Sequence, residues 1–247
     1  MSEPALVAEG RRLVAEAAAR GLALRLLGGV AIWLRASDAA RVAFGRDYPD
    51  LDLAARKKQS RALRDLLEQE GYEPERVFNA AHGAKRLLFH APDRSYHIDV
   101  FLDEFEMSHR LDLSERLVAE EWTLPAAELL LTKLQVAELN RKDASDVVML
   151  LYDHELAESD GRRQLNARWV AGLCGSDWGL YTTVADNLAK IEALLPELLL
   201  GERELVSSRL VELRRRLETG PKTRGWKLRA KVGRRVRWYE LPEEVAR

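Results

Sequence analysis

Residues 47–55 read DYPDLDLAA, and this stretch decides which fold the sequence predicts. Leu51 and Leu53 alternate with Asp50 and Asp52, which is the period-two pattern of a β-strand with one apolar and one polar face. The two aspartates therefore share a strand face, with Cα atoms about 6–7 Å apart. Two carboxylates so close repel each other unless a cation lies between them. The pattern predicts either a divalent metal site or the solvated face of an edge strand.

The segments around this strand predict a small α+β unit. Amphipathic periodicity predicts helices over residues 3–20, 30–37 and 58–70. A short apolar run over residues 22–29 predicts a strand that enters a glycine turn. Residues 86–91 and 95–103 predict a hairpin around Pro92-Asp93.

Helical periodicity dominates from residue 113 onward. We expect helices over residues 113–120, 125–140, 144–157, 162–173, 182–199 and 202–218. The chain then divides into an α+β domain over 1–112, a helical domain over 113–219 and a basic C-terminal segment over 220–247.

The C-terminal segment is distinguished by its charge. Between Gly220 and Tyr239 it holds eight basic residues and no acid. Aromatic residues such as Trp226 and Trp238 lie among these cations, and such a mixture can contact phosphates and stack on bases. RNA binding through residues 222–237 is one interpretation of this segment. The alternative is a β-hairpin that packs its aromatic side chains on the helical domain.

Composition limits the class of protein. Hydrophobic residues make up 47% of the 247 residues, charged residues 32%, and the formal net charge is −1, so a basic surface has to be local. Cys174 is the single cysteine, which excludes an intramolecular disulfide framework and a multi-cysteine zinc site. We find no signal peptide and no apolar run of about 20 residues. We therefore expect a soluble cytoplasmic protein without a membrane partner.

Two features support the metal interpretation of Asp50 and Asp52. Gly28 and Gly29 lie between an expected strand and an expected helix, where backbone amides can hold phosphate. Asp99 lies on a later strand with apolar neighbours, where it could supply a third metal ligand or a base. The alternatives are a glycine turn without a ligand and a structural acid.

A further group of charged residues follows in the helical region. Lys133 has apolar neighbours at helical spacing, so its ammonium either reaches past them to solvent or meets a polyphosphate. Asp143 is expected to cap a helix that begins at Ala144, with Asp146 in its first turn. Either aspartate could instead serve a functional site.

Taken in order, these elements resemble the nucleotidyltransferase superfamily, in particular its minimal and AbiEii-type branch. That branch has a strand ending in Gly-Gly or Gly-Ser, a DxD segment, a third acid on a later strand, and a KL-x-A-like helix followed by KD-x-x-D. The matching segments are LLGG (26–29), PDLDL (49–53), HIDVF (97–101), KLQVAELNRKD (133–143) and DASD (143–146).

The resemblance implies a nucleotidyltransferase-like short mixed sheet with flanking helices, followed by an α-helical domain. It also implies in-line transfer of a nucleoside monophosphate from an NTP, assisted by Mg²⁺ or Mn²⁺. The implied roles are triphosphate binding by Gly28 and Gly29, metal ligation by Asp50, Asp52 and Asp99 with Asp99 as a possible base, phosphate neutralisation by Lys133, and acceptor positioning by Asp143 or Asp146.

The chain departs from this branch at two points. It has Gly-Gly instead of Gly-Ser, and Tyr48-Pro49 stands where Arg-x-Thr often precedes the acids, although Arg46 could still reach the site. The acceptor implied by the resemblance is a small hydroxyl compound, a protein or a tRNA end. The alternative is a non-catalytic relative that binds nucleic acid or acts with a protein partner in a toxin-antitoxin pair.

Overall fold

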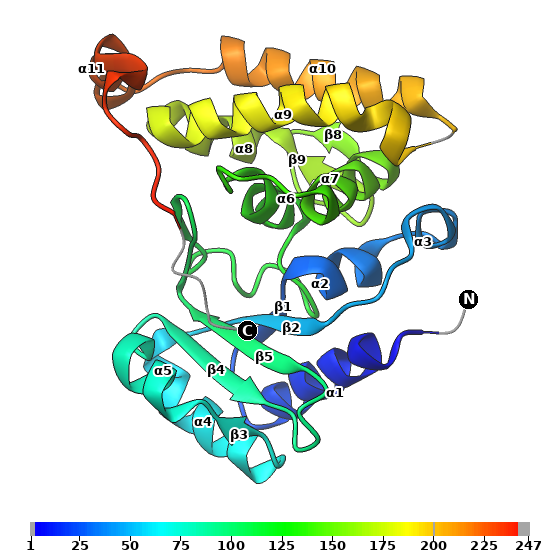
Figure 1. Ribbon diagram of the computed structural model, residues 1–247, viewed down its shortest axis with the longest axis vertical. Helices are drawn as coiled ribbons and strands as arrows, with labels where there is room; N and C mark the ends of the chain where they lie inside the picture. Colours follow the sequence, from blue (N-terminus) through cyan, green and yellow to red (C-terminus); the bar gives the residue numbers. More distant parts are fainter. Residues whose placement is uncertain (1–2, 200, 242–247) are drawn as a thin grey trace. The chain divides into compact units, whose positions relative to one another are not determined.

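The computed structural model describes residues 3–199 and 201–241 and shows a mixed α+β protein (Figure 1). The chain forms two compact units. Unit 1 comprises Met1–Phe105 and Leu111–Pro125, and unit 2 comprises Glu106–Arg110 and Ala126–Arg247. The chain passes between the units within β6 (Glu104–Glu106), within β7 (Arg110–Asp112) and again after Pro125.

Unit 1 is built on a five-stranded sheet with the strand order β1-β2-β5-β4-β3. The β2–β5 pair is parallel and the other pairs are antiparallel. The strands are β1 (Leu24–Leu26), β2 (Asp50–Ala55), β3 (Glu73–Pro74), β4 (Arg86–His90) and β5 (His97–Leu102). The helices are α1 (Ala5–Ala19), α2 (Gly28–Arg35), α3 (Asp38–Phe44), α4 (Ser60–Gln69) and α5 (Arg76–His82), with a 3₁₀ turn over Lys57–Gln59.

The strand registers give the sheet two different faces. Asp50 is opposite His97 and Asp52 is opposite Asp99, so these four side chains share one face, which we call the acidic face. β4 adds Arg86 and His90 to the same face through its pairing with β5. The opposite face, which we call the apolar face, carries the fully buried Leu24, Leu26, Leu51, Leu53, Leu87, Phe89, Ile98 and Val100.

Helix α1 packs closely on the apolar face because it has a glycine at the point of contact. A Cβ atom at Gly10 would lie 2.6 Å from Cδ2 of Leu26 and 3.0 Å from Cδ1 of Leu51. Val7, Leu13 and Val14 of the same helix are buried. The period-3.6 stripe of α1 thus covers the period-two stripe of β1 and β2, which forms the core of unit 1.

The edge strand β1 is paired on its outer side by a segment from far along the chain. Leu26 N donates to Trp122 O at 2.9 Å, and Leu124 N donates to Leu26 O at 3.0 Å. The other edge strand, β3, is two residues long and ends in Pro74. Both edges are therefore short or covered, which limits pairing with other chains.

Most expected elements of unit 1 are confirmed, with differences at their ends. The expected hairpin is β4–β5, and the expected strand 47–55 is β2, which begins at Asp50. The helix expected over 30–37 begins earlier, at Gly28. The helix expected over 113–120 is wrong, since these residues form loops and turns of unit 1. α3 and α5 were not expected, because each has only seven residues and too little periodicity to stand out.

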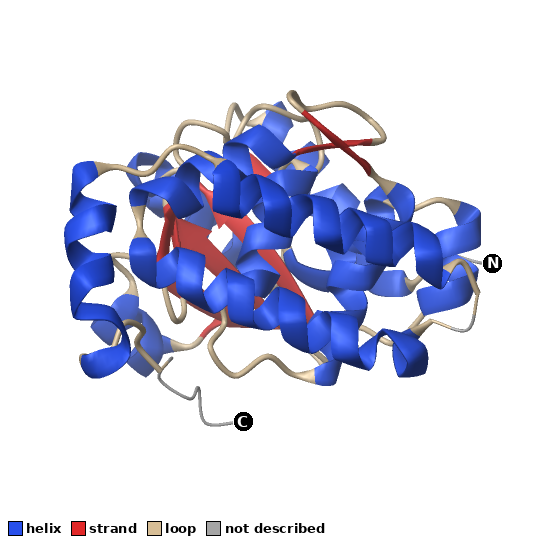
Figure 2. Cartoon of the chain, turned by 90° about the horizontal axis from the view of Figure 1, so that it is seen from above, coloured by secondary structure: helices blue, strands red, loops and turns tan. Residues whose placement is uncertain are grey.

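Unit 2 is mainly helical. Figure 2 shows that helices also predominate in the chain as a whole. Its helices are α6 (Ala126–Leu134), α7 (Arg141–Asp153), α8 (Ala167–Ser176), α9 (Trp178–Leu198), α10 (Arg203–Thr219) and α11 (Arg224–Val232). A short parallel pair, β8 (Glu155–Ala157) with β9 (Gln164–Asn166), lies where the expected helices 144–157 and 162–173 were extended too far. Within residues 3–199 and 201–241, no helix is both long and apolar enough to cross a membrane.

The basic segment forms helix α11 followed by a 3₁₀ turn over Gly233–Arg235, so the expected β-hairpin is wrong over the described residues. Thr223 caps the helix by accepting a hydrogen bond from Trp226 N, and Gly233 ends it with a φ of +61°. The aromatic side chains do pack on the helices of unit 2, as expected for that alternative. Trp226 meets the ring of Tyr181 at 5.3 Å between centroids.

Candidate functional site

The acidic face brings together three of the predicted site residues. β2 places Asp50 and Asp52 two residues apart on one face, and the parallel register places Asp99 directly beside Asp52. Asp99 is buried, at 4% exposure, whereas Asp50 and Asp52 are half-buried. The parallel register thus brings these three acids to one face of the sheet.

Gly28 places the start of α2 against Asp52. Its φ is +68°, a conformation that favours glycine, and a Cβ there would lie only 2.0 Å from Oδ2 of Asp52. Leu27 N donates to the Asp52 carbonyl at 3.0 Å, which fixes the turn against β2. The carboxylate of Asp52 and the first turn of a helix therefore face each other at contact distance.

Gly29 allows a second close approach. A Cβ at this position would lie 2.5 Å from Nη2 of Arg46 and 2.9 Å from the ring of Tyr48. The guanidinium of Arg46 lies over the Tyr48 ring, with its Cζ 4.6 Å from the ring centroid, and donates to Asp47 O at 3.1 Å. Arg46 therefore lies beside the glycine turn, as expected, and brings a cation to the helix start.

Asp99 is held by a cation that the sequence analysis missed. Nε of Arg86 donates to Oδ1 of Asp99 at 2.6 Å, and Nη2 donates to Oδ2 at 2.7 Å, so the ion pair is bidentate. Nε2 of His97 lies 3.6 Å from the same Oδ2. The Arg86 guanidinium also lies between the rings of Phe78 and Phe101, at 5.5 and 5.0 Å from their centroids.

These contacts decide how well the residues fit a divalent cation. Among the described residues, no group of three or more His, Cys, Asp or Glu side chains is arranged to hold a metal ion. The ion pair with Arg86 neutralises the Asp99 carboxylate and occupies one acceptor site on each of its oxygens, which weakens its attraction for a metal ion. Asp50 and Asp52 remain a suitable pair of oxygen donors, because Mg²⁺ in proteins often uses one or two carboxylates together with substrate phosphates and water. The donor set thus fits a cation that shares its coordination with phosphate, without Asp99.

Lys133, Asp143 and Asp146 form a second cluster, within unit 2. Nζ of Lys133 donates to Oδ1 of Asp143 at 2.7 Å and lies 3.0 Å from Oδ2 of Asp146. The Asp146 side chain is 4% exposed and that of Lys133 is 14% exposed. The charge of the Lys133 ammonium is therefore already balanced by two carboxylates, which weakens its attraction for phosphate.

The expected capping role of Asp143 is wrong. Helix α7 begins at Arg141, three residues earlier than expected, and its cap is Asn140, whose side chain accepts from Asp143 N at 2.9 Å. Asn140 Nδ2 in turn donates to Oδ2 of Asp143 at 2.7 Å, so the two side chains are also joined to each other. The backbone N–H of Asp143 is thus satisfied by Asn140, and the Asp143 carboxylate also pairs with Lys133.

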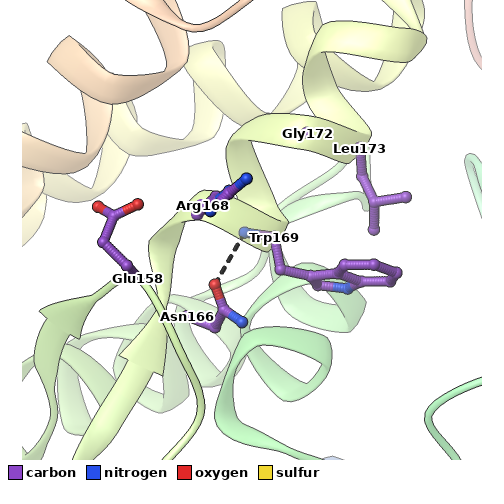
Figure 3. Close-up of a pocket in the computed structure, with 6 residues that line it drawn as sticks. All are labelled: Glu158, Asn166, Arg168, Trp169, Gly172 and Leu173. Atoms are coloured by element: carbon purple, nitrogen blue, oxygen red, sulfur yellow. Dashed lines mark hydrogen bonds between the residues drawn. The ribbon is translucent and has the colours of Figure 1, made fainter.

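A surface depression lies at the start of α8 in unit 2 (Figure 3). Its volume is about 410 Å³, and its lining is Glu158, Asn166, Arg168, Trp169, Gly172 and Leu173. Figure 3 shows Asn166 accepting a hydrogen bond from Trp169 N, which is a helix cap. No residue of the acidic face or of the Lys133 cluster lines it, so it is separate from the candidate site.

Two other reactive side chains are used structurally. Burial raises the pKa of the Cys174 thiol to about 12, which keeps it protonated at neutral pH and unsuited to act as a nucleophile. Burial lowers the pKa of His109, and its Nε2 lies 2.8 Å from Oγ1 of Thr183. Both residues belong to the packed interior of unit 2.

The sequence carries one signal for Arg86, which is its place on the strand expected to pair with that of Asp99. In the structure Leu88 pairs with Asp99, so residue 86 lies diagonally beside Asp99 on the same face. An arginine at that place in an otherwise apolar strand is the signal. Without the register of β4 and β5, Arg86 indicates only where a strand begins.

Comparison with known proteins adds no family: no family model matches the chain, and no curated protein matches it.

Proposed function

We propose that this protein is a nucleotidyltransferase that moves a nucleoside monophosphate from an NTP to a hydroxyl acceptor. The observation that carries the proposal is the contact between Asp52 and Gly28, beside Asp99, on the acidic face. A helix start with glycine amides favours phosphate, whereas a carboxylate at the same point repels it. Both can serve one ligand when a cation lies between the carboxylate and the phosphate.

Each residue of the proposed site has its own role in binding the nucleotide or the metal ion. Gly28 and Gly29 offer backbone amides to the triphosphate, and Arg46 adds positive charge beside Gly29. Asp50 and Asp52 would hold Mg²⁺, which when bound neutralises phosphate charge and orients the phosphates. Arg86, fixed by Asp99, places a second cation on the same sheet face. This is an electrostatic arrangement for phosphoryl chemistry, in which positioning and charge do most of the catalysis.

In the proposed reaction the acceptor oxygen forms a bond to the α-phosphorus. The bond from that phosphorus to the oxygen that bridges to the β-phosphorus breaks, and pyrophosphate leaves with the electron pair. The acceptor proton passes to solvent or to a carboxylate of the acidic face. Lys133, Asp143 and Asp146 enter this scheme only if the ammonium binds phosphate in spite of its two carboxylate partners.

The direct test supplies the purified chain with Mg²⁺ or Mn²⁺ and each of the four α-labelled NTPs. We expect pyrophosphate release and label in the RNA, protein or small-molecule fraction of an added cell extract. Asp52→Asn should abolish both signals, whereas Asp65→Asn, at an exposed position on α4, should leave them unchanged. Equal activity in the Asp52→Asn variant would rule out the assigned site.

A second candidate is a non-catalytic protein that binds nucleotide on the same fold. The observation that favours it is the bidentate pair of Asp99 with Arg86, which neutralises the third acid and weakens its attraction for a metal ion. Thermal melting separates the two. A stabilisation by NTP with Mg²⁺ that is lost in Asp52→Asn, without pyrophosphate release in the unchanged chain, would favour binding alone.

A further inference from the structure

Helix α11 carries three cations on one exposed ridge. Arg224, Lys227 and Lys231 are exposed, and their spacing of three and four residues puts them on the same side of the helix, over about 10 Å. We call these three residues the α11 ridge. Leu228 and Val232, which are 64% and 42% exposed, lie beside it. The ridge is thus a line of positive charge with an apolar edge.

The opposite side of α11 is fixed to unit 2 by aromatic and cation-π contacts. Trp226 packs on Tyr181, and the guanidinium of Arg229 lies 4.7 Å from the Trp178 ring centroid. Arg229 also donates to the carbonyls of Gly233 and Val236, so its hydrogen bonds are made within the segment. Arg229, on the inward side, therefore stabilises the fold of the segment, whereas the three cations of the α11 ridge do not.

Both ends of the segment are anchored on backbone at small residues. Before the helix, Thr223 N donates to Gly175 O at 3.0 Å, and a Cβ at Gly175 would lie 2.2 Å from the carbonyl oxygen of Pro221. After the helix, a Cβ at Gly179 would lie 2.7 Å from the carbonyl oxygen of Trp238. Trp238 Nε1 donates to Oγ1 of Thr183 at 3.1 Å. The ridge is therefore presented by a helix held on both sides.

The charge of the ridge is not balanced by neighbouring acids. Residues 221–239 contain no Asp or Glu. Within residues 3–199 and 201–241, none of the three ridge cations lies within ion-pair distance of a carboxylate, whereas Arg234 pairs with Asp186 at 2.7 Å. Cations held apart from acids retain their full attraction for an external polyanion.

We infer that the α11 ridge binds the phosphate backbone of a single-stranded nucleic acid. A line of three cations matches a line of phosphates, and Leu228 and Val232 offer apolar contact to sugars and base edges. An anionic membrane is the other surface that attracts basic helices, but membrane-surface helices insert large apolar side chains. Here Trp226 and Trp178 are turned to the protein, which favours the nucleic acid.

The inference does not depend on the proposed transfer reaction, because binding needs no NTP. If both hold, nucleic acid is the first class of hydroxyl acceptor to test. Failure of binding would leave the proposed reaction untouched, and failure of the reaction would leave a binding surface.

The test measures the affinity of the full chain for a labelled single-stranded RNA of about 20 nucleotides, by fluorescence anisotropy, from low to high salt without NTP. The variant replaces the ridge by Arg224→Gln, Lys227→Gln and Lys231→Gln. The control, Lys57→Gln, Lys58→Gln and Arg61→Gln, changes net charge equally at exposed positions of unit 1. Melting temperatures verify that both variants fold, and single Lys227→Glu provides a smaller change of the same surface.

We expect the ridge variant to lose affinity on the order of 30–100-fold at about 0.1 M salt and to reduce the slope of log K against log salt by about 2, since each contact to a single strand contributes about 0.7. The control should keep the original slope. Equal slopes for the two variants, or no binding by the unchanged chain at low salt, would overturn the inference. So would stronger binding to phosphatidylserine vesicles than to RNA.

Discussion

The same strands form both faces of the sheet in unit 1, but the two faces have different roles. On the apolar face, Leu51, Leu53 and Val100 are fully buried, and every side chain contributes to packing. On the acidic face, the neighbours of these residues are Asp50, Asp52 and Asp99, whose carboxylates need cations or amides. A period-two strand thus separates stability from chemistry within a single β2–β5 pair.

This division teaches where substitutions should matter and how. A change on the apolar face should lower the free energy of unfolding, because it removes packed atoms. A change on the acidic face should alter ligand binding or leave a charge without its partner.

Among these substitutions, Phe89→Ala should cause the largest loss of stability. Phe89 is fully buried on the apolar face, so truncation removes its burial and leaves a cavity. We expect the free energy of unfolding to fall by about 3–5 kcal/mol. Urea denaturation followed by circular dichroism would measure it. A loss below about 1 kcal/mol would mean that the apolar face is not the core of unit 1.

Arg86→Met should cause the second-largest loss of stability. It leaves the buried Asp99 carboxylate without its guanidinium, and removal of one partner of a buried pair costs about 3–5 kcal/mol. We expect about 2–4 kcal/mol, because the Arg86 side chain is 19% exposed and solvent compensates in part. The double variant Arg86→Met with Asp99→Leu should recover most of this loss. If the double variant is less stable than the single one, the pair is not the reason for the loss.

Gly28→Ala should show a smaller effect on stability and a specific effect on binding. Its positive φ costs an alanine about 1–2 kcal/mol, and the new Cβ would displace the Asp52 carboxylate. Gly21→Ala is the matched control, since Gly21 has a φ of +70° and nothing within 4 Å of the added Cβ. Only Gly28→Ala should lose the thermal stabilisation by NTP with Mg²⁺. The same loss in both variants would show backbone strain alone.

Asp50→Asn should have the smallest effect on the protein without ligand. Asp50 is half-buried at the start of β2, so we expect a change within about 0.5 kcal/mol. The proposed role in metal binding predicts that the stabilisation by Mg²⁺ with NTP disappears, while the effect of NTP without metal is unchanged. Calorimetric titration with each mixture would measure this. An Asp50→Asn variant with normal metal-dependent binding would remove Asp50 from the site.

The sequence predicts the parts of unit 1 that depend on local periodicity. The alternation around Asp50 and Asp52 is visible in nine residues, and the hairpin of β4 and β5 follows from its turn at Pro92-Asp93. The contacts that complete the site are non-local. The Asp52–Gly28 contact depends on how β1 and β2 pair, and the Asp99–Arg86 pair depends on a register that periodicity alone does not fix.

In unit 2, the errors came from extending or interrupting helices. Periodicity continued through Glu155–Ala157 and Gln164–Asn166, although these residues pair as parallel strands. The β-hairpin alternative for the basic segment is also wrong, because Arg224–Val232 form helix α11. The cap at Thr223 was the local signal for a helix there.

The bonds of Leu26 to Trp122 and Leu124 also affect how the chain is made. During synthesis from the N-terminus, β1 can pair with β2 early, but its outer edge stays open until Leu124 has emerged. An open edge is the place where another nascent chain can add a strand. β1 has only three residues, so little hydrogen-bonding surface is exposed during that interval. The short edge strand thereby protects unit 1 while its last segment is still being translated.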